Sequence, residues 1–264
     1  MSPVFPVVAS HARYRAAVAE LPRSTWHAET AHGAVVVIPG EGAWWEELLE
    51  AQAAGASAVV VSHPQSIPAS AQAGLVGIPV VVERPHLRAD AAAEAVRRRQ
   101  ETPATVVTVE SAAPSGDLDP VLRDGIRWAE VLAGGPLQAV SGAIPAEGGM
   151  ALLEARPPMA PDPVPVTVLA TVLGRTARTG LLRVTALGEV RTVVESDGMG
   201  LENSLTTSTE SGSTHAPVRY EGSARLALRR AMEAASKGAV LPDLGELLAD
   251  QLVVAGLRQE HKQG

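Results

Sequence analysis

Short apolar runs and amphipathic stretches alternate along the first part of the chain. The runs are continuously apolar, as in strands buried on both faces, and the stretches between them repeat apolar residues every three or four positions, as in helices. Such alternation predicts a parallel sheet with right-handed connections. The expected strands are 4–9, 33–38, 58–62, 79–83 and 104–109, and the expected helices are 11–21, 43–54, 68–74 and 89–99.

The pattern changes after the turn-rich segment 114–119. Strands there alternate apolar residues with Thr and other polar residues, which is typical of an antiparallel sheet with one buried face. We therefore predict an α/β chain, with a Rossmann-like parallel-sheet domain at 1–116 and an α+β domain with a mostly antiparallel open sheet at 117–264. The second domain is expected to contain a helix at 120–133, strands at 137–144, 166–172, 180–185, 189–194 and 201–209, and helices at 220–237 and 244–257.

Composition narrows the class of protein. Of 264 residues, 46% are hydrophobic and 19% are charged, which is typical of a globular chain. A net charge of −7 argues against nucleic acid as a partner, because phosphates favour clustered cations. The absence of cysteine excludes disulfides and thiolate metal sites. No apolar run approaches the ~20 residues of a membrane helix, so we predict a cytoplasmic protein without membrane or nucleic-acid partners.

Two segments of the first domain end in an apolar run followed by a polar pair and proline. Residues 58–64 close with Ser-His-Pro, and residues 77–85 close with Glu-Arg-Pro. Their order resembles the dinucleotide domain of the Gfo/Idh/MocA sugar oxidoreductases, which runs strand-Thr-Pro, helix, strand-Glu-Lys-Pro. In that family the lysine contacts both the cofactor and the substrate hydroxyl that is oxidised. The matching position here is Arg84, and the two lysines of the chain, Lys237 and Lys262, are distant in sequence.

The second half of the chain adds to this resemblance. Residues 132–140 are similar to the family's crossing into its second domain, and residues 147–154 are similar to its Gly-Gly-x-x-Leu-x-Asp segment, which opens a helix. Glu154 stands at the Asp position, and Pro158 stands where the family carries an acid–base histidine. Proline ends a helix, so the resemblance implies the family's architecture without that histidine.

The first strand-to-helix turn lacks the glycines of a dinucleotide site. It reads Ala-Ser-His-Ala-Arg over residues 9–13, where Gly-x-Gly-x-x-Gly would admit a pyrophosphate. Arg84 cannot act as a general acid or base, because a guanidinium stays protonated. The main interpretation is therefore a non-catalytic Gfo/Idh/MocA-like protein, acting as a partner subunit or a carbohydrate-pathway binding protein, with no cofactor expected.

The candidate site residues lie where the parallel strands are expected to end, which is where such sheets bind ligands. Arg84 and Glu154 mark the family's catalytic positions. His63 and His86 stand without a cluster of carboxylates, so no metal site is predicted. Ser10 is expected to cap the first helix. The candidates for cofactor contact are Ser10, Ser62, His63, Pro64 and Glu83.

Two alternatives remain open at this stage. The first is an active NAD(P)-dependent sugar or polyol oxidoreductase whose atypical site recruits Glu83, Glu154, His63 or His215. The second is a small-molecule-sensing regulatory module, because residues 33–99 resemble the N-terminal sensory domains of purine-catabolism regulators and of Mur ligases.

The antiparallel sheet is expected to need a partner. Its apolar positions alternate along the strands, and the two C-terminal helices can cover only one of its faces. We therefore predict a homodimer, or a heteromer with a catalytic homologue, through this sheet. The residues that carry the expectation are Val166, Val168, Val172, Leu182 and Val184. The polar run 206–214 is expected to form a loop or an exposed edge.

Overall fold

The computed structural model describes residues 4–100, 102–158, 162–174, 180–197 and 203–259. Two compact units divide the chain: residues 1–84 with 218–248, and residues 85–217 with 249–264. Each unit contains one sheet, parallel in the first and mostly antiparallel in the second. This confirms the predicted fold class. In the described part of the chain, no helix has the length and apolar character required to cross a membrane.

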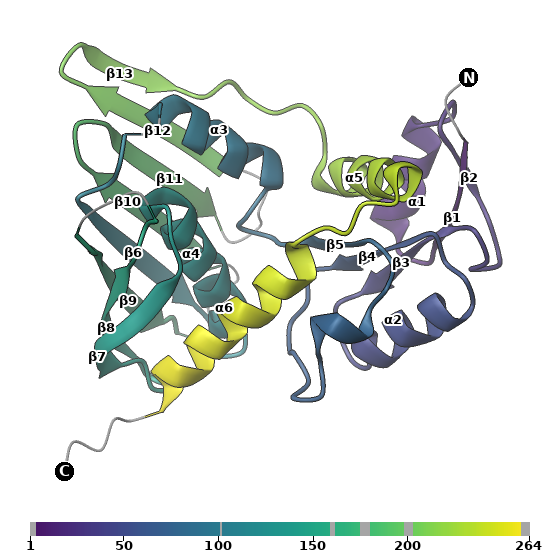
Figure 1. The fold of residues 1–264 in the computed structure, drawn as a ribbon, viewed down its shortest axis with the longest axis horizontal. Coiled ribbons are helices and arrows are strands. Elements are labelled where there is room, and N and C mark those ends of the chain that lie inside the picture. Colours follow the sequence, from purple (N-terminus) through teal and green to yellow (C-terminus); the bar gives the residue numbers. More distant parts are fainter. Residues whose placement is uncertain (1–3, 101, 159–161, 175–179, 198–202, 260–264) are drawn as a thin grey trace. The chain divides into compact units, whose positions relative to one another are not determined.

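The first unit is a five-stranded parallel sheet in the order β2-β1-β3-β4-β5 (Figure 1). Its inner strands are apolar on both faces because helices cover both faces. Helices α1 and α5 pack on one face, and α2 with the start of α6 packs on the other. The strands are β1 (Phe5–Ala9), β2 (Thr25–His27), β3 (Val35–Pro39), β4 (Ala58–Ser62) and β5 (Val80–Glu83), and the helices are α1 (Ala12–Glu20), α2 (Trp44–Ala53), α5 (Ser223–Lys237) and α6 (Asp243–Arg258).

Two details of this unit differ from the sequence-based expectation. Only a short 3-10 turn, Ala73–Leu75, stands where a helix was expected at 68–74, a segment that contains Pro68 and Gly74, both poor helix formers. Helix α5 packs on strands β4 and β5, whereas it was expected to cover the antiparallel sheet.

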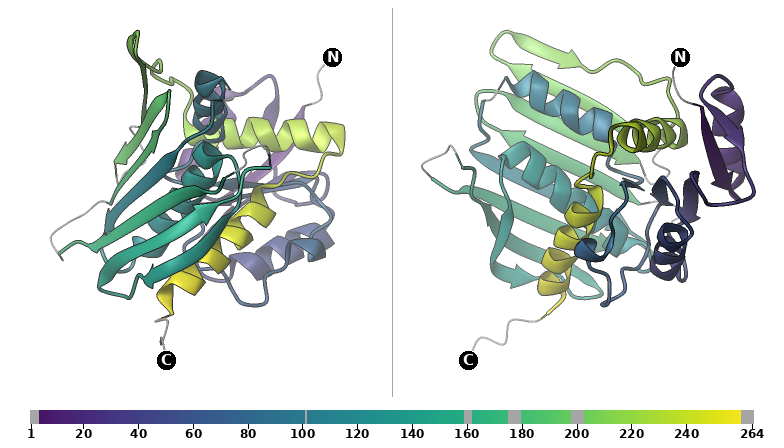
Figure 2. Two further views of the ribbon diagram at one scale, coloured as in Figure 1. Left: turned by 60° about the vertical axis from the view of Figure 1, so that its left-hand side comes forward. Right: turned by 45° about the vertical axis from the view of Figure 1, so that its right-hand side comes forward.

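The second unit is built on an eight-stranded sheet in the order β13-β12-β11-β10-β6-β9-β8-β7. Neighbours are antiparallel except for the parallel pair β6 and β9. Helices α3, α4 and the second half of α6 lie on one face of this sheet (Figure 2). The elements are α3 (Ala89–Arg99), β6 (Val106–Ala113), α4 (Leu118–Ala133), β7 (Leu137–Ala143), β8 (Gly148–Ala155), β9 (Val164–Val172), β10 (Leu181–Leu187), β11 (Arg191–Asp197), β12 (Asn203–Thr209) and β13 (Gly212–His215).

Strand β6 lies between β10 and β9, whereas the strand at 104–109 was expected to close the parallel sheet. Its buried and less buried residues alternate, as suits a strand with one face on a core. The compact units therefore do not coincide with the predicted ranges 1–116 and 117–264. Residues 206–214 form the outer hairpin of β12 and β13, an exposed edge as expected.

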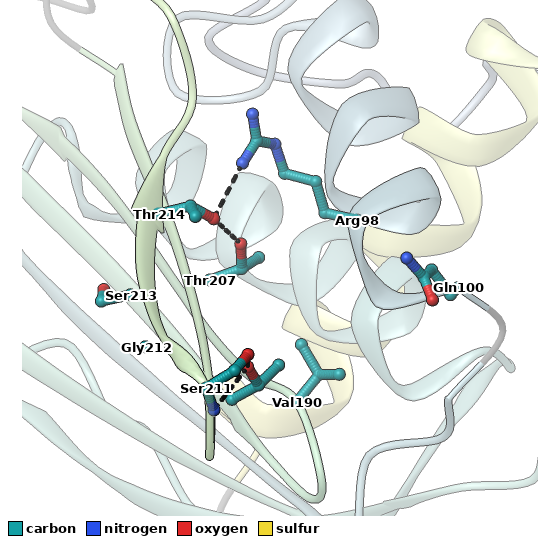
Figure 3. A pocket seen from close by; sticks show the side chains of 9 residues that line it. Arg98, Gln100, Val190, Thr207, Ser211, Gly212, Ser213 and Thr214 are labelled. Carbon is teal, nitrogen blue, oxygen red and sulfur yellow. Dashed lines mark hydrogen bonds between the residues drawn. The ribbon is translucent and has the colours of Figure 1, made fainter.

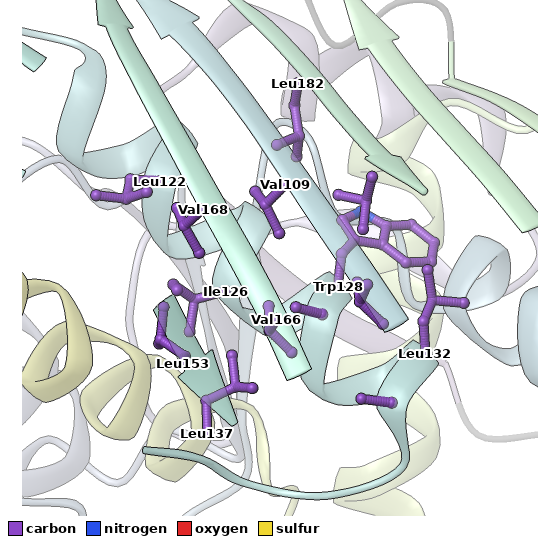
Figure 4. Close-up of a cluster of buried hydrophobic side chains, with 14 of the residues drawn as sticks. Val109, Leu122, Ile126, Trp128, Leu132, Leu137, Leu153, Val166, Val168 and Leu182 are labelled. Atoms are coloured by element: carbon purple, nitrogen blue, oxygen red, sulfur yellow. The ribbon is translucent and has the colours of Figure 1, made fainter. Parts of the chain in front are cut away.

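The core of the second unit lies between the sheet and α4 (Figure 4). Trp128 and Ile126 are fully buried there, and Trp128 Nε1 donates a hydrogen bond of 2.8 Å to the His86 carbonyl. Gly125 allows the close approach, because a Cβ at this position would lie 2.7 Å from Val109 Cγ1. Val166, Val168, Leu182 and Val184 are buried in this core. These residues thus face α4, and the uncovered face of the sheet carries a different set of apolar side chains.

Residues 148–155 form strand β8 and not the start of a helix as in the family segment that they resemble. Ala151, Leu153 and Ala155 are buried, whereas Met150 and Leu152 are exposed, which is the alternation of a strand with one buried face. Because the helical context is absent, matching Glu154 and Pro158 to the family's Asp and His positions loses its structural basis.

Candidate functional site

The direction of winding reverses between β1 and β3 in the parallel sheet. The chain runs from β1 through α1 to β2 on one side, and from β3 through α2 to β4 on the other. Ligands of open parallel sheets bind beyond the carboxyl ends of the strands at such a switch point. The turns that follow β1, β3 and β4 therefore define the candidate site, together with the end of β5.

Glu83, the last residue of β5, carries a buried carboxylate at this edge. It accepts hydrogen bonds from Tyr14 Oη at 2.6 Å and Ser62 Oγ at 2.9 Å, and Arg13 forms an ion pair with it. Burial raises the pKa of Tyr14 above its ordinary value, so the phenol stays a donor. A carboxylate removed from water needs such donors. Its charge is thus held in place by three side chains from α1 and β4.

His63 follows β4 directly and adopts φ 54°, a left-handed conformation that is uncommon for residues other than glycine. Its Nε2 lies 3.6 Å from Glu83 Oε2 and 3.1 Å from Arg13 Nη1. Its side chain is 33% exposed, whereas that of Glu83 is only 4% exposed. Unusual backbone conformations gather at functional sites. The arrangement presents a partly exposed imidazole beside a fixed carboxylate, which is the geometry of an acid–base pair.

The backbone around His63 is tightly constrained. Its N–H donates a hydrogen bond of 2.8 Å to the Glu83 carbonyl. Gly40, in the turn after β3, packs so closely on the next turn that a Cβ would lie 2.4 Å from Pro64 Cα. The turns that follow β3 and β4 therefore hold one another, and the imidazole is attached to a rigid edge of the sheet.

Arg13 connects separate elements of the first unit. Besides contacting Glu83 and His63, its Nη2 donates a hydrogen bond of 3.1 Å to Ser223 Oγ at the start of α5. Sequence reasoning missed Arg13, Tyr14 and Ser223. The position of the first two, in the turn of a helix directly after the first strand, was an available signal. No local pattern in the sequence points to Ser223, which is 210 positions from Arg13.

The structure brings Ser62, His63 and Glu83 together, and Pro64 packs against Gly40 beside them. Ser10 does not cap α1: the N-cap is His11, and it makes no side-chain capping bond. Arg84, at the position matched to the family lysine, is 6% exposed. Its burial sets it apart from His63, whose ring reaches solvent.

The other candidates lie in the second unit. Glu154, on β8, pairs with Arg156 at 2.5 Å. His215, on the edge strand β13, has its Nδ1 2.9 Å from Thr206 Oγ1. His86 is 4% exposed, and burial lowers its pKa, which suits a neutral structural group. Among the residues that the structure describes, no group of three or more His, Asp or Glu side chains is arranged to hold a metal ion.

The edge of the first unit has features that fit a dinucleotide. Helices α1 and α2 both begin there, and neither of their N-caps makes a side-chain hydrogen bond. The first amides of a helix and its dipole attract phosphate, and Arg13 adds a positive charge to the first turn of α1. The turn before α1 lacks glycine, but Ser10 and Ala12 are small and exposed.

No protein-family model and no curated protein sequence matches the chain. Solved structures share its fold over its whole length. A variant of KijD10, a 3-ketoreductase from Actinomadura kijaniata in complex with TDP-benzene and NADP, is similar with a TM-score of 0.67 and 15% identity over 97% of each chain. The UDP-N-acetylglucosamine 3-dehydrogenase GnnA from Acidithiobacillus ferrooxidans has a TM-score of 0.59 and 14% identity, covering 97% of this chain and 98% of its own.

A third similar structure is a putative NADPH-dependent oxidoreductase from Desulfitobacterium hafniense, with a TM-score of 0.62 and 11% identity over 97% of each chain. At these identities the likeness establishes the fold, which is that of nicotinamide-dependent oxidoreductases and is consistent with the Gfo/Idh/MocA resemblance. It contradicts the main interpretation, a non-catalytic partner subunit, because the similar structures include a ketoreductase and a dehydrogenase. KijD10 is in complex with NADP in these structures, which is consistent with the alternative expectation of a nicotinamide cofactor.

Proposed function

We propose that the chain is an NAD(P)-dependent oxidoreductase that interconverts a hydroxyl and a carbonyl group on a sugar or polyol. The observation that carries this proposal is the partly exposed His63 imidazole beside the buried Glu83 carboxylate, at the ligand-binding edge of the parallel sheet. The likeness to a 3-ketoreductase in complex with NADP supports the cofactor, and the likeness to a UDP-N-acetylglucosamine 3-dehydrogenase supports the substrate class; each covers 97% of the chain.

Oxidation of an alcohol removes a hydride from carbon and a proton from oxygen. The nicotinamide, when bound, supplies the acceptor for the hydride. His63 takes the proton through the exposed part of its ring, and in the reverse direction returns it to the carbonyl oxygen. The negative charge of Glu83, 3.6 Å from His63 Nε2, favours the resulting imidazolium and offsets part of its repulsion by Arg13. The atypical feature is a histidine in the role that lysine has in the family that the sequence resembles.

The first turn of α1 would hold the pyrophosphate through its backbone amides, with Arg13 as the nearest cation. Arg13 is already paired with Glu83 and faces His63. Its position therefore couples the phosphate-binding turn to the acid–base pair, so that one side chain responds to both.

The decisive test is turnover of NADP or NADPH with a panel of sugars, polyols and nucleotide sugars, followed by nicotinamide absorbance. We expect turnover with at least one member, and a fall in kcat of about 100-fold in His63→Ala. His27→Ala is the matched control, because His27 is an exposed histidine in the same unit. Absence of both turnover and NADP binding, or equal activity of the two variants, would refute the proposal.

We also propose that the uncovered face of the eight-stranded sheet packs against a second copy of the chain. This face carries ion-paired charges, Arg183, Glu110 and Glu195, and exposed apolar side chains on β8, β9 and β10, namely Met150, Leu152, Leu169, Leu181 and Leu187. A stable sheet-to-sheet interface buries about 1,600 Å² in total. Light scattering on the purified protein should give a dimer that Leu152→Glu converts to a monomer. A wild-type monomer at tens of micromolar would exclude the homodimer.

A further inference from the structure

A cavity of about 420 Å³ with a mixed polar and apolar lining lies in the second unit, between the end of α3 and the outer hairpin (Figure 3). It is separate from the His63 cluster, which belongs to the first unit. Hydroxyl groups make up most of its polar lining. The lining residues are Arg98, Gln100, Val190, Thr207, Thr209, Ser211, Gly212, Ser213 and Thr214.

The hydroxyls of the cavity are already ordered by one another. Thr207 and Thr214 lie opposite each other on β12 and β13, with their oxygens 2.9 Å apart, and Arg98 Nη1 donates to Thr214 Oγ1 at 3.2 Å. Thr209 and Ser211 form a similar pair at 2.7 Å. Each hydroxyl has one donor and two acceptor positions, so one mutual bond leaves further capacity on each. The lining can thus bind a polyhydroxylated ligand without first reorganising.

Positive charge is concentrated at this end of α3, although the chain as a whole is acidic. Three consecutive arginines, Arg97, Arg98 and Arg99, end the helix, and Glu94 is the carboxylate paired with the first two. Hydrogen bonds from Arg98 and Arg97 lower the pKa of Glu94, so it stays ionised. Glu189 and Glu210, two carboxylates that are adjacent in sequence to lining residues, are exposed and are not part of the lining.

Arg99 is hydrogen-bonded to one residue of the cavity lining and is 4% exposed. Its Nη1 donates to the Val190 carbonyl at 2.7 Å and to Thr192 Oγ1 at 3.0 Å, and Val190 is itself a lining residue. Its Nη2 is buried, and no described residue accepts a hydrogen bond from it. Burial lowers the pKa of Arg99. Both acceptors are neutral, so the guanidinium is a buried cation without a carboxylate partner in the described part of the chain.

We propose that this cavity binds a phosphorylated sugar or polyol, as a site distinct from the proposed active site. A cavity of this volume accommodates a small metabolite. Arg98 supplies a direct charged donor for the phosphate. The buried charge of Arg99 favours an anion near it, because an uncompensated cation in a poorly solvated place gains most from one. The threonine and serine hydroxyls bind the hydroxyl groups of the ligand.

Calorimetric titration of the full chain with glucose 6-phosphate, glucose and inorganic phosphate tests the proposal. We expect glucose 6-phosphate to bind about tenfold or more tightly than either of the other two probes, because only it engages both the cation and the hydroxyls. No binding of glucose 6-phosphate at millimolar concentration would overturn the proposal. Inorganic phosphate binding as tightly as glucose 6-phosphate would overturn the sugar component and leave an anion site only.

Two pairs of variants locate the site. Arg98→Gln should weaken glucose 6-phosphate binding about tenfold, whereas Arg97→Gln should not, because Arg97 shares the helix and the Glu94 partner but is 67% exposed and outside the lining. Thr214→Val should weaken binding, whereas Thr206→Val, outside the lining, should not. Equal effects within either pair would contradict the proposal. Weakened binding in His63→Ala would assign the ligand to the proposed active site instead.

Discussion

Glu83 in the first unit and Arg99 in the second are both charged side chains withdrawn from solvent, but their surroundings differ. Glu83 is met by a cation and two hydroxyl groups, so its charge is compensated within the chain. Arg99 is met by a carbonyl and a hydroxyl, which are dipoles without net charge. The difference suggests a division of roles: a compensated charge organises a site, whereas a charge without an ionised partner among the described residues leaves attraction available for a ligand.

Among these variants, the largest change in the free energy of unfolding is expected when the Glu83 carboxylate is removed. Glu83→Ala leaves the partly buried Arg13 and the buried Tyr14 without their acceptor, and we expect a loss of about 3 kcal/mol in the free energy of unfolding. Urea unfolding measures it. Glu154→Ala is the control: it breaks an ion pair with Arg156, which is 65% exposed, and should cost less than about 1 kcal/mol. Equal costs would mean that the Glu83 cluster is not a stabilising network.

Tyr14→Phe removes one donor from Glu83 while retaining the ring. We expect a loss of about 2 kcal/mol at neutral pH, since the lost hydrogen bond is to a charged group. The pKa of Tyr14 is raised in the folded chain, so its contribution is complete below the unfolded value of about 10 and is lost as the pH rises from there towards the folded pKa. Unfolding measured across alkaline pH should show this extra loss in the wild type and not in Tyr14→Phe.

Arg99→Met tests whether the buried Arg99 charge serves ligand binding and not the stability of the fold. Replacing an uncompensated buried cation by an apolar side chain of similar length should change the free energy of unfolding by less than about 1 kcal/mol, because relief of desolvation offsets two lost hydrogen bonds. Glucose 6-phosphate should stabilise the wild type against thermal unfolding and not the variant. A loss as large as that of Glu83→Ala would show that Arg99 is structural.

The smallest effect on stability is expected from His63→Gly. Glycine adopts the left-handed conformation without a steric cost of about 1 kcal/mol, which compensates for the contacts that the imidazole loses. Stability should therefore remain within about 1 kcal/mol of the wild type, while kcat falls about 100-fold, as in His63→Ala. A stability loss comparable to that of Glu83→Ala would mean that the ring is needed for the fold.

The sequence predicted where strands and helices lie along the chain better than which sheet each of them joins or covers. Strand β3 was recognisable because its apolar run is buried on both faces, but the sheet to which β6 belongs depends on tertiary pairing. Helix α5 has one apolar face, which fits either sheet equally well, and only the structure places it on β4 and β5.

The sequence predicted only those residues of the candidate site that directly follow or end a strand. Ser62, His63 and Glu83 were candidates because parallel strands end at one edge of a sheet. Arg13 and Tyr14 come from a helix whose side-chain direction the sequence does not fix, and Ser223 comes from a distant segment. The emphasis on Arg84 came from matching a short motif, and motif matching carries no information on burial.

Helix α6 has a consequence for the synthesis of the chain. Leu244 and Leu247 belong to the core around α2, whereas Val254 and Leu257 belong to the core around α4. During translation, neither hydrophobic core can be completed until this last helix has left the ribosome. Fragments that end before α6 should therefore expose apolar side chains of both cores.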